Sequence, residues 1–221
     1  DSQDAEKTGR GIPNYLGPAV LSPDGLTAWV PSKQDNIRSG TMRDGRELDF
    51  DHTVRSITSR IDLGTKSELI GSRIDHDNAG VASSALFGPY GNYLFVALET
   101  NRKVSVVNAY TASELFRFDV GMAPQGLALS SDGLTLYVHN FMDRTITVHD
   151  IAMLIQLGEE DVSHVSTYST VAAETLADDV LLGKQLFYDA RDTRLAKDSY
   201  MSCASCHNDG GHDGRVWDIS H

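Results

Sequence analysis

The chain has 221 residues, of which 31 are acidic and 19 are basic, so its formal net charge is −12 at pH 7. A chain of this length buries a core, and its negative charge disfavours nucleic acid and anionic membranes while favouring a partner protein with a basic surface. We find no apolar run that predicts a membrane span and no signal-peptide pattern, so an exported protein would be present in its mature form.

Three stretches share one pattern: an apolar alternating run, a turn with a glycine, and a second apolar run. They are GPAVLSPDGLTAWVP from Gly17, SSALFGPYGNYLFVA from Ser83 and GLALSSDGLTLYVHN from Gly126. Such turns suit hairpins because glycine accepts a positive φ. The turn glycines Gly91 and Gly133 are separated by about 40 residues, the length of one propeller blade.

The segments between these hairpins predict further strands. They begin at Ser56 (SITSRIDLGTKSELIGSRID), Lys103 (KVSVVNAYTASELFRFDV) and Arg144 (RTITVHDIAM). Four antiparallel strands per repeat are typical of a β-propeller blade. A β-sandwich with regular turns is the alternative.

The pattern SSDGLTLYVHN followed by TITVHDI resembles the YVTN-type β-propeller repeats, with His139 where that family usually has threonine. The resemblance covers about residues 15–157, and we assign residues 1–157 to propeller blades. Propellers close with about four to eight blades. Two fairly complete blades and part of a third are visible here, so we predict an incomplete ring that another chain or a missing segment completes.

Several polar features within this region have structural interpretations. The charged insertion at residues 34–53 is expected to be a solvated loop rather than a metal site. His76 is expected to be a polar turn residue, and His139 and His149 are expected to make structural hydrogen bonds at strand ends.

After residue 157 the pattern changes. Residues 158–174 are polar and rich in small side chains, which predicts a linker. A helix should follow, with a cap formed by Thr175 and Asp178. Four residues share one face of this helix at the helical period: Leu176, Val180, Gly183 and Phe187. Gly183 would let a flat group or another backbone approach, or would serve core packing.

The stretch MSCASCHNDGG, residues 201–211, contains both cysteines of the chain, Cys203 and Cys206, followed by His207. A disulfide between them would close too small a loop to add much stability. A redox-active dithiol would need a βαβ setting, which the surrounding sequence does not predict. Zinc would need ligands from a more distant segment, and remains an alternative.

Covalent haem c attachment explains all three residues. Thiols three residues apart on one helical turn bond the two vinyl-derived positions of one haem edge, and the next histidine lies beneath the iron. We therefore predict Cys203 and Cys206 as the thioether residues. His207 is predicted as the proximal ligand of the haem iron.

The stretch from Leu182, LGKQLFYDARDTRLAKDSYMSCASCHNDGGHDGR, resembles the N-terminal haem segment of the bacterial dihaem cytochrome c peroxidase and MauG-like family. It matches at Gly183, Lys184, Leu186, Phe187, Asp189, Arg191, Ser202, Cys203, Cys206 and His207. The resemblance implies that residues 175–221 are the N-terminal part of an α-helical cytochrome c domain. It also implies a second haem and a calcium ion outside this chain, and an exported protein in the periplasm or at the cell surface.

The sixth ligand of the iron has two candidates, His221 and the nearer His212. An exposed loop histidine is the alternative interpretation of both. Arg215 and Trp217 are candidates for contact with a haem propionate and the ring edge. No catalytic acid or base is assigned from the sequence.

Two functions follow from these predictions. The first is a haem c redox protein on a propeller scaffold, which transfers electrons to or from a partner with a basic surface and, with an open iron position, reduces hydrogen peroxide. The second is a propeller-based binding or surface protein whose CxxCH segment is not redox-active or binds zinc.

Overall fold

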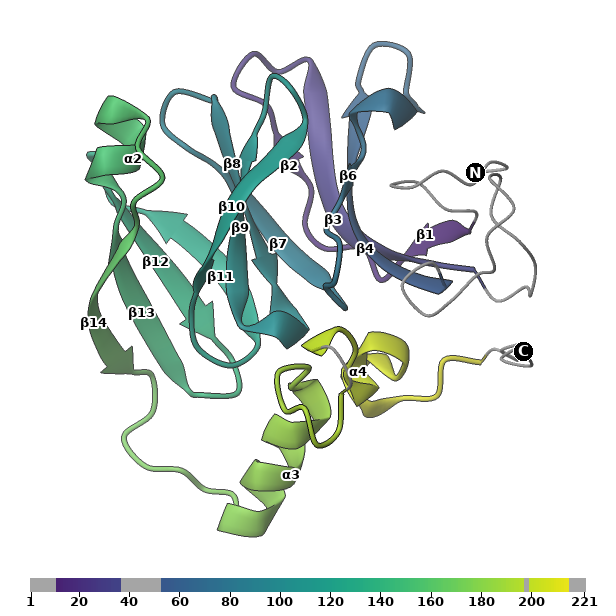
Figure 1. The fold of residues 1–221 in the computed structure, drawn as a ribbon, viewed down its shortest axis with the longest axis vertical. Coiled ribbons are helices and arrows are strands. Elements are labelled where there is room, and N and C mark those ends of the chain that lie inside the picture. The colour runs from purple at the N-terminus through teal and green to yellow at the C-terminus, as the bar shows by residue number, and fades with distance from the viewer. Residues whose placement is uncertain (1–10, 37–52, 197–198, 215–221) are drawn as a thin grey trace.

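The computed structural model describes residues 11–36, 53–196 and 199–214. Three antiparallel sheets lie side by side and fan out from one another, and the C-terminal helices lie across one end of them (Figure 1). The prediction of a mainly β protein built from propeller blades is confirmed. Within the described residues, no helix has both the length and the apolar character of a membrane span.

The first blade is built on the long hairpin β3–β4. Its strands are β1 (Ile12–Asn14), β2 (Val20–Leu21), β3 (Thr27–Asp35), β4 (Val54–Asp62), β5 (Ser67–Glu68) and β6 (Ile74–Asp75), with the 3-10 helix η1 (Ile70–Ser72) between the last two. Both β1 and β2 pair with β3, while β5 and β6 pair with β4. The strands β1 and β2 together therefore take the place of the first strand of a four-stranded blade, and β5 and β6 together take the place of the last strand.

The second and third blades each have four consecutive strands. The second contains β7 (Ala82–Phe87), β8 (Tyr93–Leu98), the 3-10 helix η2 (Glu99–Asn101), β9 (Lys103–Asn108) and β10 (Ser113–Asp119). The third contains β11 (Pro124–Leu129), β12 (Thr135–Asn140), β13 (Thr145–Asp150), helix α2 (Ala152–Leu157) and β14 (Ser163–Ser169). The strands follow one another across both sheets, from β7 to β10 and from β11 to β14, which is the order expected of propeller blades.

The turns of successive blades stack on one another. Gly91 and Gly133 have φ angles of 70° and 73°, which favour glycine. A Cβ atom on Gly91 would lie 2.7 Å from a side-chain carbon of Pro23, and one on Gly133 would lie 2.8 Å from Pro89. The same contact thus recurs from the first blade to the second and from the second to the third.

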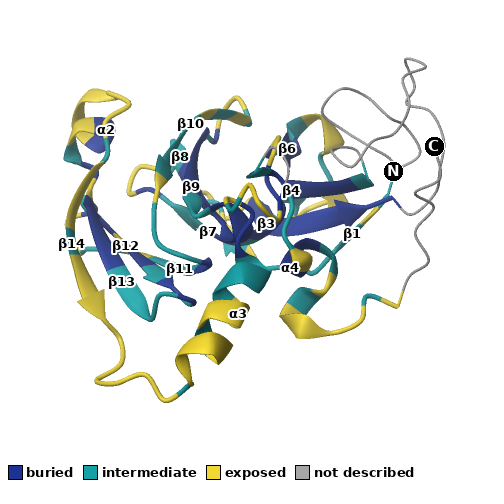
Figure 2. Cartoon of the chain, turned by 60° about the horizontal axis from the view of Figure 1, so that its bottom comes forward, coloured by how far each residue is buried: buried dark blue, intermediate teal, exposed yellow. Residues whose placement is uncertain are grey.

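The core lies between neighbouring blades. Strand β8 is buried almost throughout and contributes to both interfaces: Leu94, Val96 and Leu98 pack with Trp29 towards the first blade. Phe95, one position out of phase, packs towards the third blade. This alternation places the second blade between two others, and its buried strands β8 and β9 are coloured mainly dark blue in Figure 2.

The predicted linker is partly wrong. Residues 158–174 contain β14, which pairs with β13 and completes the third blade. Its side chains are largely exposed, with Val165 at 60% and Tyr168 at 62%, because β14 is the edge strand of its sheet. An edge strand of this kind needs few apolar residues, which explains why its sequence resembles a linker.

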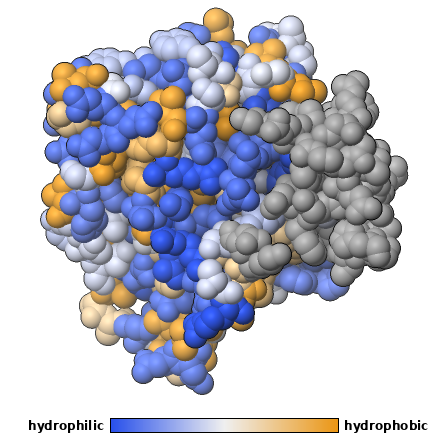
Figure 3. Space-filling view, viewed as in Figure 1, coloured by the Kyte–Doolittle hydropathy of each residue, from blue (hydrophilic) through white to orange (hydrophobic). Residues whose placement is uncertain are grey.

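The predicted helix is present as α3 (Asp178–Tyr188), but the predicted cap formed by Thr175 and Asp178 is wrong. The residue before the helix, Ala177, makes no side-chain cap; Glu174 instead accepts hydrogen bonds from the backbone N–H groups of Thr175 and Leu176, both at 2.8 Å. No residue of α3 is fully buried, and a Cβ atom on Gly183 would meet nothing within 4 Å. Apolar and polar side chains therefore share the surface over this helix (Figure 3).

His76 is not an exposed turn residue. It is 1% exposed, and its Nε2 atom lies 2.9 Å from Thr58 Oγ1. Its Nδ1 atom lies 3.2 Å from Glu114 Oε2, on the second blade. His76 therefore connects two blades, while His149 is bonded to Thr147 at 3.0 Å as expected for a structural histidine.

Candidate haem attachment site

The CASCH motif forms a single helical turn, α4 (Cys203–Cys206). Both cysteines are free; Cys203 is exposed and Cys206 is half-buried. The backbone N–H of His207 donates to the carbonyl of Cys203 at 2.9 Å and ends the turn. The local geometry thus presents two accessible thiols from one turn and places the histidine directly after it.

The imidazole of His207 is oriented by its own loop. Its Nδ1 atom lies 3.0 Å from the carbonyl oxygen of Gly211, just after the 3-10 helix η4 (Asn208–Gly210). Because a carbonyl oxygen only accepts, Nδ1 carries the proton and Nε2 holds the free lone pair. A histidine that ligates iron through Nε2 commonly has this arrangement. The residues present therefore fit a c-type haem.

The two candidates for the sixth ligand are placed differently. The ring of His212 lies 6.2 Å from the ring of His207, centroid to centroid, and its Nδ1 atom accepts a hydrogen bond of 2.8 Å from the N–H of Gly214. His221, Arg215 and Trp217 lie outside the described residues. The sixth position of the iron therefore stays a prediction.

The side of α4 away from the thiols is packed into the propeller. Ala204 is 2% exposed, and the residue next to it, Ser205, is completely buried. Burial also raises the pKa of the Cys206 thiol, and the nearby ammonium group of Lys33 opposes this rise. The turn is thus half embedded, with Cys203 and His207 facing outward.

The second blade holds the segment that leads to α4. The backbone N–H of Ala190 donates to the carbonyl of Thr100 at 2.8 Å, and Asn101 Nδ2 donates to the carbonyl of Ser199 at 2.9 Å. Arg102 forms an ion pair with the buried carboxylate of Asp189. These three consecutive propeller residues follow β8 and therefore form one docking point.

A second group of contacts anchors α3. Gln185 Nε2 donates to the carbonyl of Met142 at 3.1 Å, and the ammonium group of Lys184 lies 5.9 Å from the centre of the Phe141 ring. Arg191 pairs with Asp119 at 3.0 Å. Of the residues that carry the family resemblance, Lys184, Asp189 and Arg191 therefore contact the propeller here.

A group of ionisable side chains near α4 was not predicted from the sequence. Glu99 is 2% exposed, and its carboxylate accepts a hydrogen bond of 3.2 Å from Gln125; burial raises its pKa to about 7. Tyr15 donates to Asp209 at 3.2 Å, and burial raises the pKa of Tyr15 well above its usual value. The strand that precedes Glu99 is apolar. The sequence signal that could have indicated a buried carboxylate was therefore its position directly after this apolar run.

Zinc, the alternative metal, would require a cluster of ligands. Among residues 11–36, 53–196 and 199–214, no group of three or more histidine, cysteine, aspartate or glutamate side chains is placed so that it could hold a metal ion.

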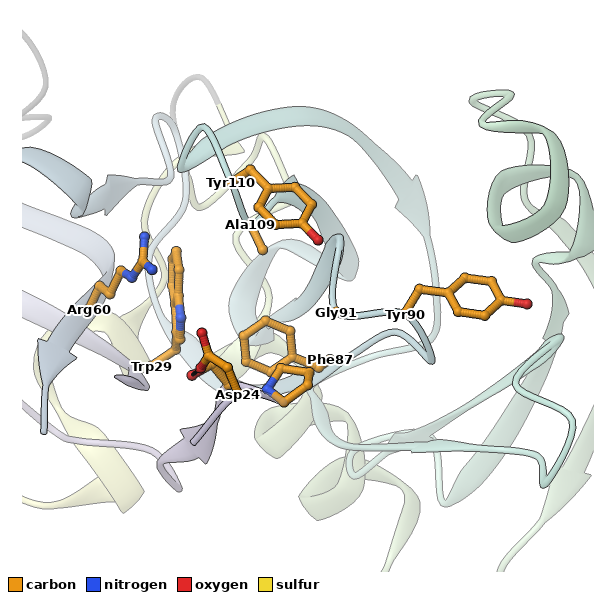
Figure 4. Close-up of a pocket in the computed structure, with 10 residues that line it drawn as sticks. Asp24, Trp29, Arg60, Phe87, Tyr90, Gly91, Ala109 and Tyr110 are labelled. Carbon is orange, nitrogen blue, oxygen red and sulfur yellow. Dashed lines mark hydrogen bonds between the residues drawn. The ribbon is translucent and has the colours of Figure 1, made fainter. Parts of the chain in front are cut away.

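A small pocket of about 150 Å³ lies between the first two blades, lined by their turns (Figure 4). The guanidinium group of Arg60 lies 5.2 Å from the centre of the Trp29 ring, and Phe87 meets the same ring edge-on at 6.2 Å. The pocket is near the start of β3, whereas α4 contacts the other end of that strand. It is therefore separate from the haem attachment site.

Together, these features define a β-propeller that carries a c-type haem attachment motif docked on its blades. Residues 177–220 match the family model described as di-haem cytochrome c peroxidase. This match begins one residue before α3 and includes the whole CASCH motif. The resemblance inferred from the motif is therefore found independently. No curated protein matches the sequence.

The solved structures that resemble the fold include a gluconolactonase and a hydrazine synthase. The periplasmic gluconolactonase PpgL of Pseudomonas aeruginosa has a TM-score of 0.51 and 18% identity, over 78% of this chain and 46% of the other. Hydrazine synthase of Kuenenia stuttgartiensis has a TM-score of 0.50 and 16% identity, over 62% of this chain and 45% of the other. This chain therefore spans less than half the length of either of these two proteins, and at these identities the matches show the fold alone.

Proposed function

We propose that this protein is an exported haem c redox protein that transfers single electrons, with the haem held by the CASCH turn on the propeller. Cys203 and Cys206 form the two thioether bonds, and His207 Nε2 is the proximal ligand. A bound haem c supplies one-electron redox chemistry at its iron. The hydrogen bond from His207 Nδ1 to Gly211 carries the proposal, because it leaves Nε2 free to ligate the iron.

Reduction of hydrogen peroxide to water is the second activity we propose. The match of residues 177–220 to the di-haem cytochrome c peroxidase family supports it. The reaction takes two electrons per peroxide, which a donor protein must supply. A second haem and a calcium ion would lie beyond the residues described here.

The donor is proposed to be a protein with a basic surface. The net charge of −12 supports this, as does the exposed carboxylate of Asp209, two residues from His207. Opposite charges speed the encounter of redox partners and make it sensitive to salt. Export to the periplasm or cell surface belongs to the same proposal, since haem c is attached outside the bacterial cytoplasm.

The test is the pyridine haemochrome spectrum of the denatured protein, produced in a host that attaches haem c. We expect a haem c spectrum that stays with the polypeptide, and its loss in the double variant C203A/C206A. S163A, at an exposed position of the edge strand β14, is the control and should keep the haem. A colourless wild-type protein from such a host would contradict the proposal and favour a propeller-based binding protein.

Peroxidase activity needs a separate measurement. Peroxide is added to the reduced, haem-loaded protein, and the oxidation of the haem is followed by its absorbance. Turnover that is lost on removal of the haem supports the second activity. A reduced haem that persists in excess peroxide would limit the function to electron transfer.

A further inference from the structure

A buried lysine of the first blade contacts the haem attachment turn directly. Lys33, near the end of β3, is 1% exposed, and its Nζ atom donates a hydrogen bond of 2.7 Å to the carbonyl oxygen of Ser205. Ser205 is the residue between Ala204 and Cys206, inside the CASCH motif. The two residues are 172 positions apart in the sequence, so only the tertiary fold brings them together.

This buried lysine lies beside a buried carboxylate. Asp35 Oδ2 lies 3.2 Å from Lys33 Nζ, and both side chains are 1% exposed. Removing two charges from water costs several kcal/mol per ion in general, and their attraction offsets that cost only when the geometry is good. A neutral apolar pair would usually fill such a site at least as well, so the charges call for an explanation beyond stability.

The contact also fixes the position of α4. Carbonyl groups at the end of a helix lack partners within the helix, and Lys33 supplies a charged donor for one of them. Beside it, a Cβ atom on Gly80 would lie 2.3 Å from Ser205 Oγ, so the propeller backbone packs tightly against the same residue. Ser205 Oγ in turn accepts a hydrogen bond of 3.1 Å from the N–H of Ser202.

The orientation of the ion pair places its positive member next to the motif. The ammonium group, rather than the carboxylate of Asp35, bonds the carbonyl adjacent to Cys206. A buried positive charge acts strongly here because the low dielectric constant screens it little.

We propose that Lys33 is a positioning residue for the haem, which fixes the attachment turn through Ser205 and raises the reduction potential of the iron by its charge. This inference rests on the proposed haem attachment. Reduction adds one electron to the haem, so a nearby positive charge stabilises the reduced form and favours the electron-accepting role.

The test compares reduction potentials of the haem-loaded protein by redox titration. K33M keeps most of the length of the side chain but removes the charge. We expect its reduction potential to fall by an amount that shifts the redox equilibrium severalfold; a tenfold shift equals about 59 mV for one electron. K33R keeps the charge and should restore most of the potential. K103M is the matched control, since Lys103 pairs with Asp119 at the surface, 3.3 Å away.

D35N separates charge from packing. It removes the negative member of the pair and should raise the potential, whereas general loosening of the site would lower the potential in D35N and K33M alike. If K33M does not fold, D35N decides alone: a potential at or below the wild-type value overturns the proposal. A K33M potential equal to that of the wild type overturns it as well.

Failure of the proposed function can be distinguished from failure of the proposed role of Lys33. Wild-type protein without covalent haem would refute the haem proposal itself. Wild-type protein with haem, but with potentials that are the same in all variants, would refute only the role of Lys33.

Discussion

The Nδ1 atom of His207 lies 3.0 Å from the carbonyl oxygen of Gly211, and this bond leaves Nε2 as the free ligand atom of an exposed imidazole. The bond is made within a short loop, so it does not depend on the propeller. The proximal ligand is therefore prepared locally, whereas the turn that carries the thiols is held by contacts over a long sequence distance.

Replacement of the proximal ligand should uncouple haem attachment from iron ligation. In H207A both thioether bonds should form, since Cys203 and Cys206 remain, but the optical spectrum should lose the features of a histidine-ligated iron. Added imidazole should restore them, because it can enter the space left by the side chain. A spectrum of H207A identical to that of the wild type would exclude His207 as the ligand; H212A tests the neighbouring histidine in the same way.

Two glycine variants should have opposite effects on stability. G80A places a Cβ atom 2.3 Å from Ser205 Oγ and 2.6 Å from Thr100 Oγ1, so overpacking should lower the free energy of unfolding by about 1–3 kcal/mol. G183A adds a methyl group in open space on α3 and should raise it by about 0.5–1 kcal/mol. Chemical denaturation measures both. A G80A variant as stable as the wild type would show that the haem segment is not docked as described.

The ion pair between Arg102 and Asp189 should control how firmly α3 and its following loop are held. R102M leaves the buried carboxylate of Asp189 without its charged partner, which should cost about 1–3 kcal/mol and increase proteolytic cleavage after α3. R194M is the control, because Arg194 is 81% exposed and pairs with Asp192 at the surface. Equal cleavage rates in R102M and R194M would contradict this prediction.

Glu99 should make stability depend on pH. Its pKa in the folded protein is raised from 4.5 to about 7, mainly by burial. The contribution of the protonated Glu99 to the free energy of unfolding is therefore fully present below pH 4.5 and is lost as the pH rises to about 7. The loss amounts to roughly 3 kcal/mol. E99Q should abolish this part of the dependence, as seen in the difference between wild-type and variant unfolding curves at several pH values. The surface variant E159Q should behave like the wild type. If the difference in the free energy of unfolding between the wild type and E99Q stays constant across pH 4.5–7, Glu99 is not the source of the pH dependence.

The sequence by itself determined the features that depend on neighbouring residues. Hairpins follow from alternating apolar runs around turns such as the one at Gly133, and the repeat of these hairpins predicts blades. The haem motif is equally local, because the spacing of Cys203 and Cys206 places both thiols on one turn. Family-specific residues such as Asp189 extended the prediction to the match that residues 177–220 show.

Other features were decided only by the tertiary structure. The polar strand β14 forms because β13 offers a partner edge, and its own composition gives little indication of a strand. Nothing in the sequence distinguishes Lys33 from a surface lysine, yet the fold buries it against Ser205. Core packing was one of two predictions for Gly183, but α3 leaves this position open. In each case the deciding contact joins residues that are distant in the sequence or depends on what lies beyond the helix, and periodicity carries no information about such contacts.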